Sequence, residues 1–174
     1  MEEKTHSEVL FKRHLQAAGK LEYAKGKRPD VKCIFCAIRE NNPNVVSLKL
    51  YKNETYFICL NLYPYNPGHL MIIPNKHAER FEDLNKQERS EMFEATMKVQ
   101  EMLRNELEPT GFNVGYNQGQ YSGASIKHVH IHVVPRYKSE LGFIDIVSQT
   151  KVIIQRASDI LDLLKPKIRD YMEN

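Results

Sequence analysis

The chain has 174 residues, 41% of them hydrophobic, which fits a single domain with an ordinary core. Lysine and arginine number 25 against 22 aspartates and glutamates, a small excess compared with the concentrated basic stripe of a protein that coats nucleic acid. We therefore expect no nucleic-acid partner. No window approaches the apolar length of a membrane span, and the charged N-terminus lacks the apolar segment of a signal peptide. We expect a cytoplasmic protein without a membrane partner.

The first part of the chain predicts an arm followed by strands. Residues 1–30 combine a weak helical pattern over 5–19 with a basic, turn-rich linker. The β-branched and aromatic runs at 47–51 and 55–60 predict a hairpin. After the proline- and glycine-rich loop "NLYPYNPG", residues 69–74 predict a buried strand that ends at Pro74.

The second part predicts helix, strands and helix. Asn85 is a helix N-cap with Glu88 as its capping-box partner, and apolar residues recur at helical spacing until Pro109. Strand-like runs follow at 112–117 and 127–136, and Pro166 interrupts a helical pattern over 153–172. This order predicts an α+β domain over 31–152, with an antiparallel sheet and helices on one side, and a C-terminal helical extension over 153–174.

Three histidines, His128, His130 and His132, alternate with aliphatic residues in the second of these runs. Successive side chains of a strand point to opposite faces, so the three imidazoles are expected on one face and Val129, Ile131 and Val133 on the other. The pattern therefore predicts one chemical face and one core face.

Three interpretations of the histidines are open on the residues alone. They could be polar side chains of a half-buried strand, or the ligands of a catalytic zinc ion. Same-face residues lie roughly 7 Å apart along a strand, so three in line do not converge tightly on one ion. The third interpretation makes the middle imidazole a nucleophile and its neighbours phosphate-binding groups, since imidazole is largely neutral at pH 7. The adjoining "NQGQYSGAS", with two glycines and several polar side chains, favours a phosphate.

The run His128-Val129-His130-Ile131-His132-Val133-Val134 resembles the signature of the histidine triad (HIT) superfamily. The resemblance extends over roughly 33–151 and includes "LNLYPYNPGHLMIIPNKHAERFEDL". It implies the HIT-like fold, an antiparallel sheet with packed helices that usually pairs into a homodimer, and chemistry at the α-phosphorus of a nucleotide.

The same resemblance implies roles for individual residues. His130 would attack the phosphorus and form a covalent nucleotidyl-histidine, while His132 would bind the transferred phosphate. The remaining expected nucleotide-binding residues are Asn61 for the ribose, Leu62 for the base, and Asn117, Gly123 and Ser125 for the phosphate oxygens. His69, in the "PGH" element, would support the site.

Cys33 and Cys36 form a Cys-x-x-Cys pair, which alone is compatible with a metal site, a redox pair or core thiols. Some bacterial HIT proteins bind zinc through this pair, a histidine after the "PGH" strand and the first histidine of the triad. The resemblance thus implies a structural zinc on Cys33, Cys36, His77 and His128. If His128 holds zinc, it cannot also act as a general acid. Cys59, within an apolar strand, is expected in the core.

Three activities fit these residues: phosphorolysis of dinucleoside polyphosphates, their hydrolysis, and hydrolysis of nucleoside phosphoramidates, with inorganic phosphate or water as acceptor. The segments around "PYNPGHLMIIP" and "HVVPRYKSELGF" most resemble the bacterial diadenosine tetraphosphate phosphorylases, which favours phosphorolysis. A nucleotide-binding module without turnover and a zinc-organised interaction protein are the alternatives of another class.

Overall fold

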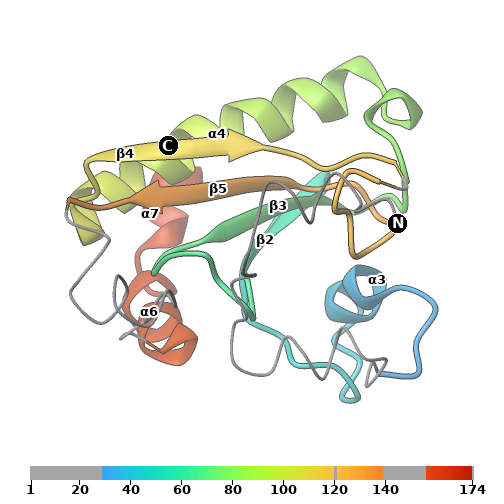
Figure 1. Ribbon diagram of the computed structural model, residues 1–174, viewed down its shortest axis with the longest axis horizontal. Coiled ribbons are helices and arrows are strands. Elements are labelled where there is room, and N and C mark those ends of the chain that lie inside the picture. The colour runs from blue at the N-terminus through green and yellow to red at the C-terminus, as the bar shows by residue number, and fades with distance from the viewer. Residues whose placement is uncertain (1–28, 120, 139–155, 174) are drawn as a thin grey trace, which may run out of the picture.

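The computed structural model describes residues 29–119, 121–138 and 156–173 (Figure 1). The helix expected over 5–19 lies outside them. In chain order the elements are α3 (Ile34–Arg39), β1 (Lys49–Lys52), β2 (Tyr56–Leu60), β3 (Leu70–Pro74), the 3-10 helix η1 (Phe81–Asp83), α4 (Lys86–Leu107), β4 (Gly111–Gly115), β5 (Ile131–Arg136), α6 (Ala157–Leu164) and α7 (Ile168–Met172). The expected α+β class with an antiparallel sheet is confirmed.

The strands form one sheet in the order β1-β2-β3-β5-β4, and every neighbouring pair is antiparallel. The expected hairpin is the pair β1 and β2, and the strand that ends at Pro74 is β3. The histidine strand is shorter than expected, because β5 begins only at Ile131. Before it, the N–H of Val129 donates to the carbonyl of Ala78 at 2.8 Å, in the segment that follows β3.

Both faces of the sheet are covered at the central strands β2 and β3, which corrects the expectation of helices on one side. Residues alternate between two cores along β2 and β3, as the period of a strand requires. Ile58 and Ile72 pack with α4, α6 and α7, whereas Phe57 and Ile73 pack with α3 on the opposite face. In Figure 1, α4 runs along the top of the sheet, and α3 is the separate short helix, in blue, at the lower right. This division explains why β2 and β3 are buried at every position.

The faces of the histidine segment separate as the sequence predicts. Val129, Ile131 and Val133 belong to the core with α4. The paired position of His132 on β3 is Met71, which belongs to the core on the α3 side. The imidazoles are therefore displayed toward α3.

The long helix α4 begins as the sequence predicts. The side chain of Asn85 accepts a hydrogen bond from the N–H of Glu88 at 2.9 Å, and the Glu88 carboxylate accepts from the N–H of Asn85 at 2.7 Å. Glu108, at φ 49°, ends the helix immediately before Pro109.

The C-terminal helices share the main core. Ile160 and Leu164 of α6 and Ile168 and Met172 of α7 pack with the apolar face of α4, and Pro166 lies in the turn that separates the two helices. The expected interruption is confirmed. None of the helices within the described residues combines the length and apolar character that crossing a membrane requires.

Candidate functional site

A cavity of about 380 Å³ opens beside β5 on the α3 side of the sheet. This volume lies within the usual range of small-molecule sites. Phe35, Ile38 and Met71 provide an apolar wall. The cavity is also lined by all the residues expected to bind or attack a nucleotide, namely Asn61, Leu62, Asn117, Gly123, Ser125, His130 and His132. His128 is absent from this lining.

Asn61 and Leu62 reach the cavity because they follow β2 directly. The N–H of Asn61 donates to the carbonyl of His69 at 2.9 Å, and the Asn61 side-chain oxygen accepts from the N–H of Tyr63 at 2.9 Å. This Asx turn fixes the backbone where the chain leaves the sheet. Leu62 is 43% exposed and therefore offers apolar surface to a ligand.

His130 is a buried imidazole that borders the cavity and has a defined hydrogen-bond partner at Nδ1. Its side chain is buried, and Phe35 packs edge-on against it at a ring-centroid distance of 4.8 Å. Burial lowers the pKa of His130. Nδ1 lies 2.8 Å from the carbonyl oxygen of His128, so Nδ1 carries the proton and donates it to that bond. The lone pair of a neutral ring with this tautomer is on Nε2.

His132 has the opposite tautomer because a chain of hydrogen bonds fixes it. The N–H of Tyr65 donates to Nδ1 of His69 at 3.2 Å, which leaves the His69 proton on Nε2. His69 Nε2 lies 3.0 Å from His132 Nδ1, and therefore donates to it. A neutral His132 then carries its own proton on Nε2 and can donate it to an anion. The ring centroids of His130 and His132 are 4.6 Å apart, so the two imidazoles are direct neighbours.

The loop between β4 and the histidines turns at two glycines. Gly119 has φ 98° and Gly123 has φ 87°, a region that side chains with a Cβ rarely adopt. The Ser122 hydroxyl donates to the carbonyl of Gly119 at 2.9 Å and closes the turn. The loop thereby returns Gly123 and Ser125 to the cavity that Asn117 lines from the end of β4.

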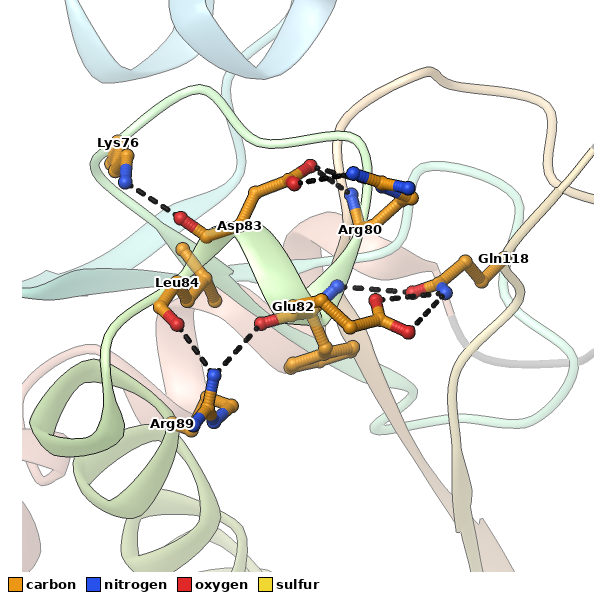
Figure 2. Close-up of polar contacts among 8 residues, drawn as sticks. Lys76, Arg80, Glu82, Asp83, Leu84, Arg89 and Gln118 are labelled. Atoms are coloured by element: carbon orange, nitrogen blue, oxygen red, sulfur yellow. Dashed lines mark hydrogen bonds and ion pairs between the residues drawn. The ribbon is translucent and has the colours of Figure 1, made fainter.

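Gln118 fastens the start of this loop to η1, as Figure 2 shows. Its side-chain oxygen accepts from the N–H of Phe81 at 3.0 Å, and its amide group donates to the Glu82 carboxylate at 3.1 Å. The ring of Phe81 also contacts Tyr116, with centroids 4.3 Å apart. Asn117 is therefore flanked on both sides by contacts to η1.

The other polar contacts drawn in Figure 2 hold η1 itself. Arg80 pairs with Asp83 at 2.9 Å, and Arg89 of α4 donates to the carbonyl of Leu84 at 2.6 Å. The nearby Arg80 guanidinium lowers the pKa of Asp83, so this carboxylate stays ionised in the pair. The segment between β3 and α4 is thus fixed to the helix that follows it.

A second cluster lies next to the cavity, on the same α3 side of the sheet. It consists of Cys33, Cys36, His77 and His128, whose ligand atoms all lie within 4.8 Å of one another. His128 Nδ1 is 3.4 Å from Cys33 Sγ and 3.7 Å from Cys36 Sγ, and His77 Nδ1 is 3.4 Å from Cys36 Sγ. In a tetrahedral zinc site with Zn–S near 2.3 Å and Zn–N near 2.1 Å, sulfur and nitrogen ligands lie about 3.6 Å apart. The four donors therefore fit a metal ion.

The surroundings of His128 suit a ligand more than a proton donor. Its Nε2 lies 3.1 Å from the carbonyl oxygen of Pro74, so the proton is on Nε2 and Nδ1 is free to face the thiols. Burial and then the nearby His77 lower the pKa of His128 to about 4. Burial and then the Cys33 thiol raise the pKa of Cys36 to about 11. Cys59 is separate from this cluster and buried in the core, as expected.

Three features of the site did not follow from the sequence. Phe35 packs against both His128 and His130, although it belongs to a helix that the sequence did not predict. The contact of Gln118 with η1 joins segments about forty positions apart. His69 was expected as a support, but its bond to His132 requires β3 and β5 to pair. For the contact between Gln118 and η1, the one local signal in the sequence is that Gln118 directly follows Asn117, a candidate phosphate-binding residue.

The fold and the cavity define an α+β protein in which paired histidines and a glycine loop face a pocket of ligand size. The chain belongs to the HIT domain family, whose model matches residues 42–139. An AP-4-A phosphorylase of Mycobacterium tuberculosis is 42% identical over 118 residues, which are 67% of this chain and 60% of the relative. The match therefore spans less than two thirds of that protein.

A second relative and a solved structure show the same similarity. The asymmetrical bis(5'-nucleosyl)-tetraphosphatase of Schizosaccharomyces pombe is 31% identical, and the match covers 59% of this chain and 57% of the relative. The crystal structure of a HIT family protein from Bacillus anthracis superposes with a TM-score of 0.58 at 30% identity, over 64% of this chain and 77% of that one. The expected family and fold are confirmed.

Proposed function

We propose that this protein cleaves dinucleoside polyphosphates such as diadenosine tetraphosphate at the α-phosphorus, through a covalent nucleotidyl-histidine, and transfers the nucleotidyl group to inorganic phosphate. The observation that carries the proposal is the state of His130, whose Nδ1 proton is engaged by the His128 carbonyl while the ring borders the cavity. Two relatives named for a phosphorylase and a tetraphosphatase support this substrate class.

The reaction would proceed in two displacements. His130 Nε2 attacks the α-phosphorus and forms a P–N bond, and the electron pair of the broken P–O bond leaves on the polyphosphate. An oxygen of inorganic phosphate then attacks the same phosphorus, and the pair of the P–N bond returns to Nε2. With diadenosine tetraphosphate the products are ATP and ADP. Water as the acceptor would give ATP and AMP.

The other residues would bind charge and position the nucleoside. The Nε2 proton of His132, with Asn117, Gly123 and Ser125, would hold the non-bridging oxygens as negative charge develops on them. Asn61 would bind the ribose hydroxyls and Leu62 would contact the base. His128, whose two ring nitrogens are engaged elsewhere, would act through its carbonyl on His130 and not as an acid. A polyphosphate is a good leaving group that does not require one.

Incubation with diadenosine tetraphosphate, with and without inorganic phosphate, tests both the activity and the acceptor. We expect ATP and ADP when phosphate is present. His130→Ala should reduce turnover by at least about a thousandfold because the nucleophile is lost. The same variant should still bind AMP, which shows that the cavity is intact. Unchanged turnover by His130→Ala would exclude His130 as the nucleophile.

We further propose that Cys33, Cys36, His77 and His128 hold a structural zinc ion. When bound, the ion would join the start of α3 to the segments before α4 and β5, and so keep Phe35 against His130. The site has four protein donors, which is typical of structural zinc and leaves no position for catalysis.

Metal analysis of the purified protein tests the zinc proposal without any assay of turnover. We expect about one zinc ion per chain in the wild-type protein. Cys36→Ser should strongly lower this zinc content and also lower the midpoint of thermal unfolding. Cys59→Ala is the matched control, because this thiol lies in the core and should leave the zinc content unchanged. A zinc-free wild-type protein whose Cys33 and Cys36 are freely alkylated would contradict the proposal.

A further inference from the structure

A second cavity, of about 410 Å³, adjoins the one that contains the histidines. The two cavities share Ala124, Ser125 and Ile126 of the glycine loop, together with Pro29 and Ile34. Ser125 therefore borders both a candidate phosphate position and the neighbouring space. Nothing in the two displacements described above has used this second cavity.

Two lysines give the second cavity its charge. Lys32, before α3, and Lys127, before His128, both line it, and none of its lining residues is acidic. Both side chains are exposed, and neither forms an ion pair with any residue that the structure describes. Ammonium groups in such a position are available to bind phosphate oxygens.

Displacement at phosphorus requires space for phosphate groups beyond the α-phosphate. Attacking and leaving groups lie roughly in line, so the leaving polyphosphate must depart on the side of the α-phosphorus opposite His130. The acceptor must then displace His130, and so it must approach from that same side. One phosphate-binding space can therefore serve the leaving group in the first step and inorganic phosphate in the second.

We propose that Lys32 and Lys127 form a phosphate subsite that binds the leaving polyphosphate and then the inorganic phosphate acceptor. This inference rests on the function proposed above and deepens it, because it names the residues that would favour phosphate over water. Water needs no cationic subsite to reach the phosphorus. The two lysines thus select between phosphorolysis and hydrolysis without touching the nucleoside.

Lys32→Gln and Lys127→Gln test this subsite, since each removes the charge and keeps much of the side-chain length. We expect each to raise the KM for phosphate about tenfold. At a fixed phosphate concentration, each should also lower the ratio of ADP to AMP. Hydrolysis of adenosine 5′-phosphoramidate releases ammonia and no polyphosphate. Its rate should therefore change less than about twofold in either variant. Lys86→Gln is the matched control, because Lys86 is an exposed lysine on α4 outside both cavities.

A binding measurement keeps this test separate from the test of turnover. Calorimetric titration with inorganic tripolyphosphate should show binding that both variants weaken about tenfold and that Lys86→Gln leaves intact. If the wild-type protein binds tripolyphosphate in this way but processes no nucleotide, the proposed function fails and the subsite stands. If nucleotides are processed and the lysine variants match the wild type in phosphate KM and tripolyphosphate affinity, the subsite is wrong. The subsite is also wrong if the lysine variants lose phosphoramidate hydrolysis as strongly as phosphorolysis, because such losses would indicate a general effect on the active site.

Discussion

His130 immediately precedes β5 and His132 lies on it, yet their hydrogen bonds require different tautomers. His130 donates from Nδ1 to a backbone carbonyl, whereas His132 Nδ1 accepts from His69. We expect ¹⁵N–¹H correlation spectra at neutral pH to show an Nδ1-protonated His130 and an Nε2-protonated His132. His69→Phe should remove this constraint on His132 and leave His130 unchanged. Identical tautomers in the wild-type protein would contradict the two roles.

Gly68, beside His69, occupies a position that a side chain cannot enter without cost. Its φ is 80°, and a Cβ there would lie 2.6 Å from Leu107 Cδ1. We expect Gly68→Ala to reduce the free energy of unfolding by about 2–4 kcal/mol, because the strained backbone and the clash add. Urea unfolding measures this.

Gly111→Ala provides the control for Gly68, because a Cβ at Gly111 meets nothing within 4 Å. Its effect should stay within about 0.5 kcal/mol. Equal stability of the two alanine variants would mean that the loop before His69 moves freely to admit a side chain.

At the residue scale the sequence predicted which side chains gather but not their chemical states. Alternation alone separates His130 and His132 from Val129 and Ile131, since it depends only on strand period. A tautomer depends on partners across the fold. The partners of His132 come from β3 and the loop before it, and a local pattern does not contain that pairing.

The connection between η1 and the loop after β4 can be tested by exchanging the amide of Gln118 and the carboxylate of Glu82. Gln118→Glu places a second carboxylate against Glu82, and we expect affinity for AMP to fall on the order of threefold as Asn117 loses its position. Adding Glu82→Gln to this variant restores a donor opposite the new carboxylate and should recover the affinity. Glu82→Gln alone is the control and should bind AMP normally, because an amide oxygen still accepts from Gln118.

Titration calorimetry with the three variants measures this cycle. No recovery in the double variant would show that the contact with Glu82 does not position the loop.

At the element scale, prediction succeeded where the signals are local. The capping box at Asn85 and Glu88 defines the start of α4, and the runs around 47–60 define the hairpin. It failed for α3, a six-residue helix whose apolar face is organised by contact with β2 and β3. A helix this short has little intrinsic stability, so its sequence carries a weak signal. The late start of β5 also depends on a contact across the fold. The N–H of Val129 donates to the carbonyl of Ala78, which does not belong to a strand.

At the scale of the whole molecule, the two edge strands of the sheet, β1 and β4, differ in charge. The β1 edge carries Lys49 and Lys52, and charged residues of this kind discourage further strand pairing. The β4 edge carries no charged residue between Gly111 and Gly115, and Val114 on it is 42% exposed. We therefore expect the homodimer implied by the family resemblance to form by antiparallel pairing of two β4 strands. Such an interface is isologous and joins two five-stranded sheets.

Val114→Lys tests this assembly, because it would place two buried ammonium groups in a symmetric interface. We expect light scattering after gel filtration to give a dimer for the wild-type protein and a dissociation constant raised at least about tenfold for the variant. Leu163→Lys is the matched control, since Leu163 is an exposed apolar residue on α6, away from β4, and should leave the dimer intact. A wild-type monomer, or a dimer that tolerates Val114→Lys, would show that this edge is protected in another way. The nucleotide cavity would then be complete within one chain, because every residue proposed for it already lines it here.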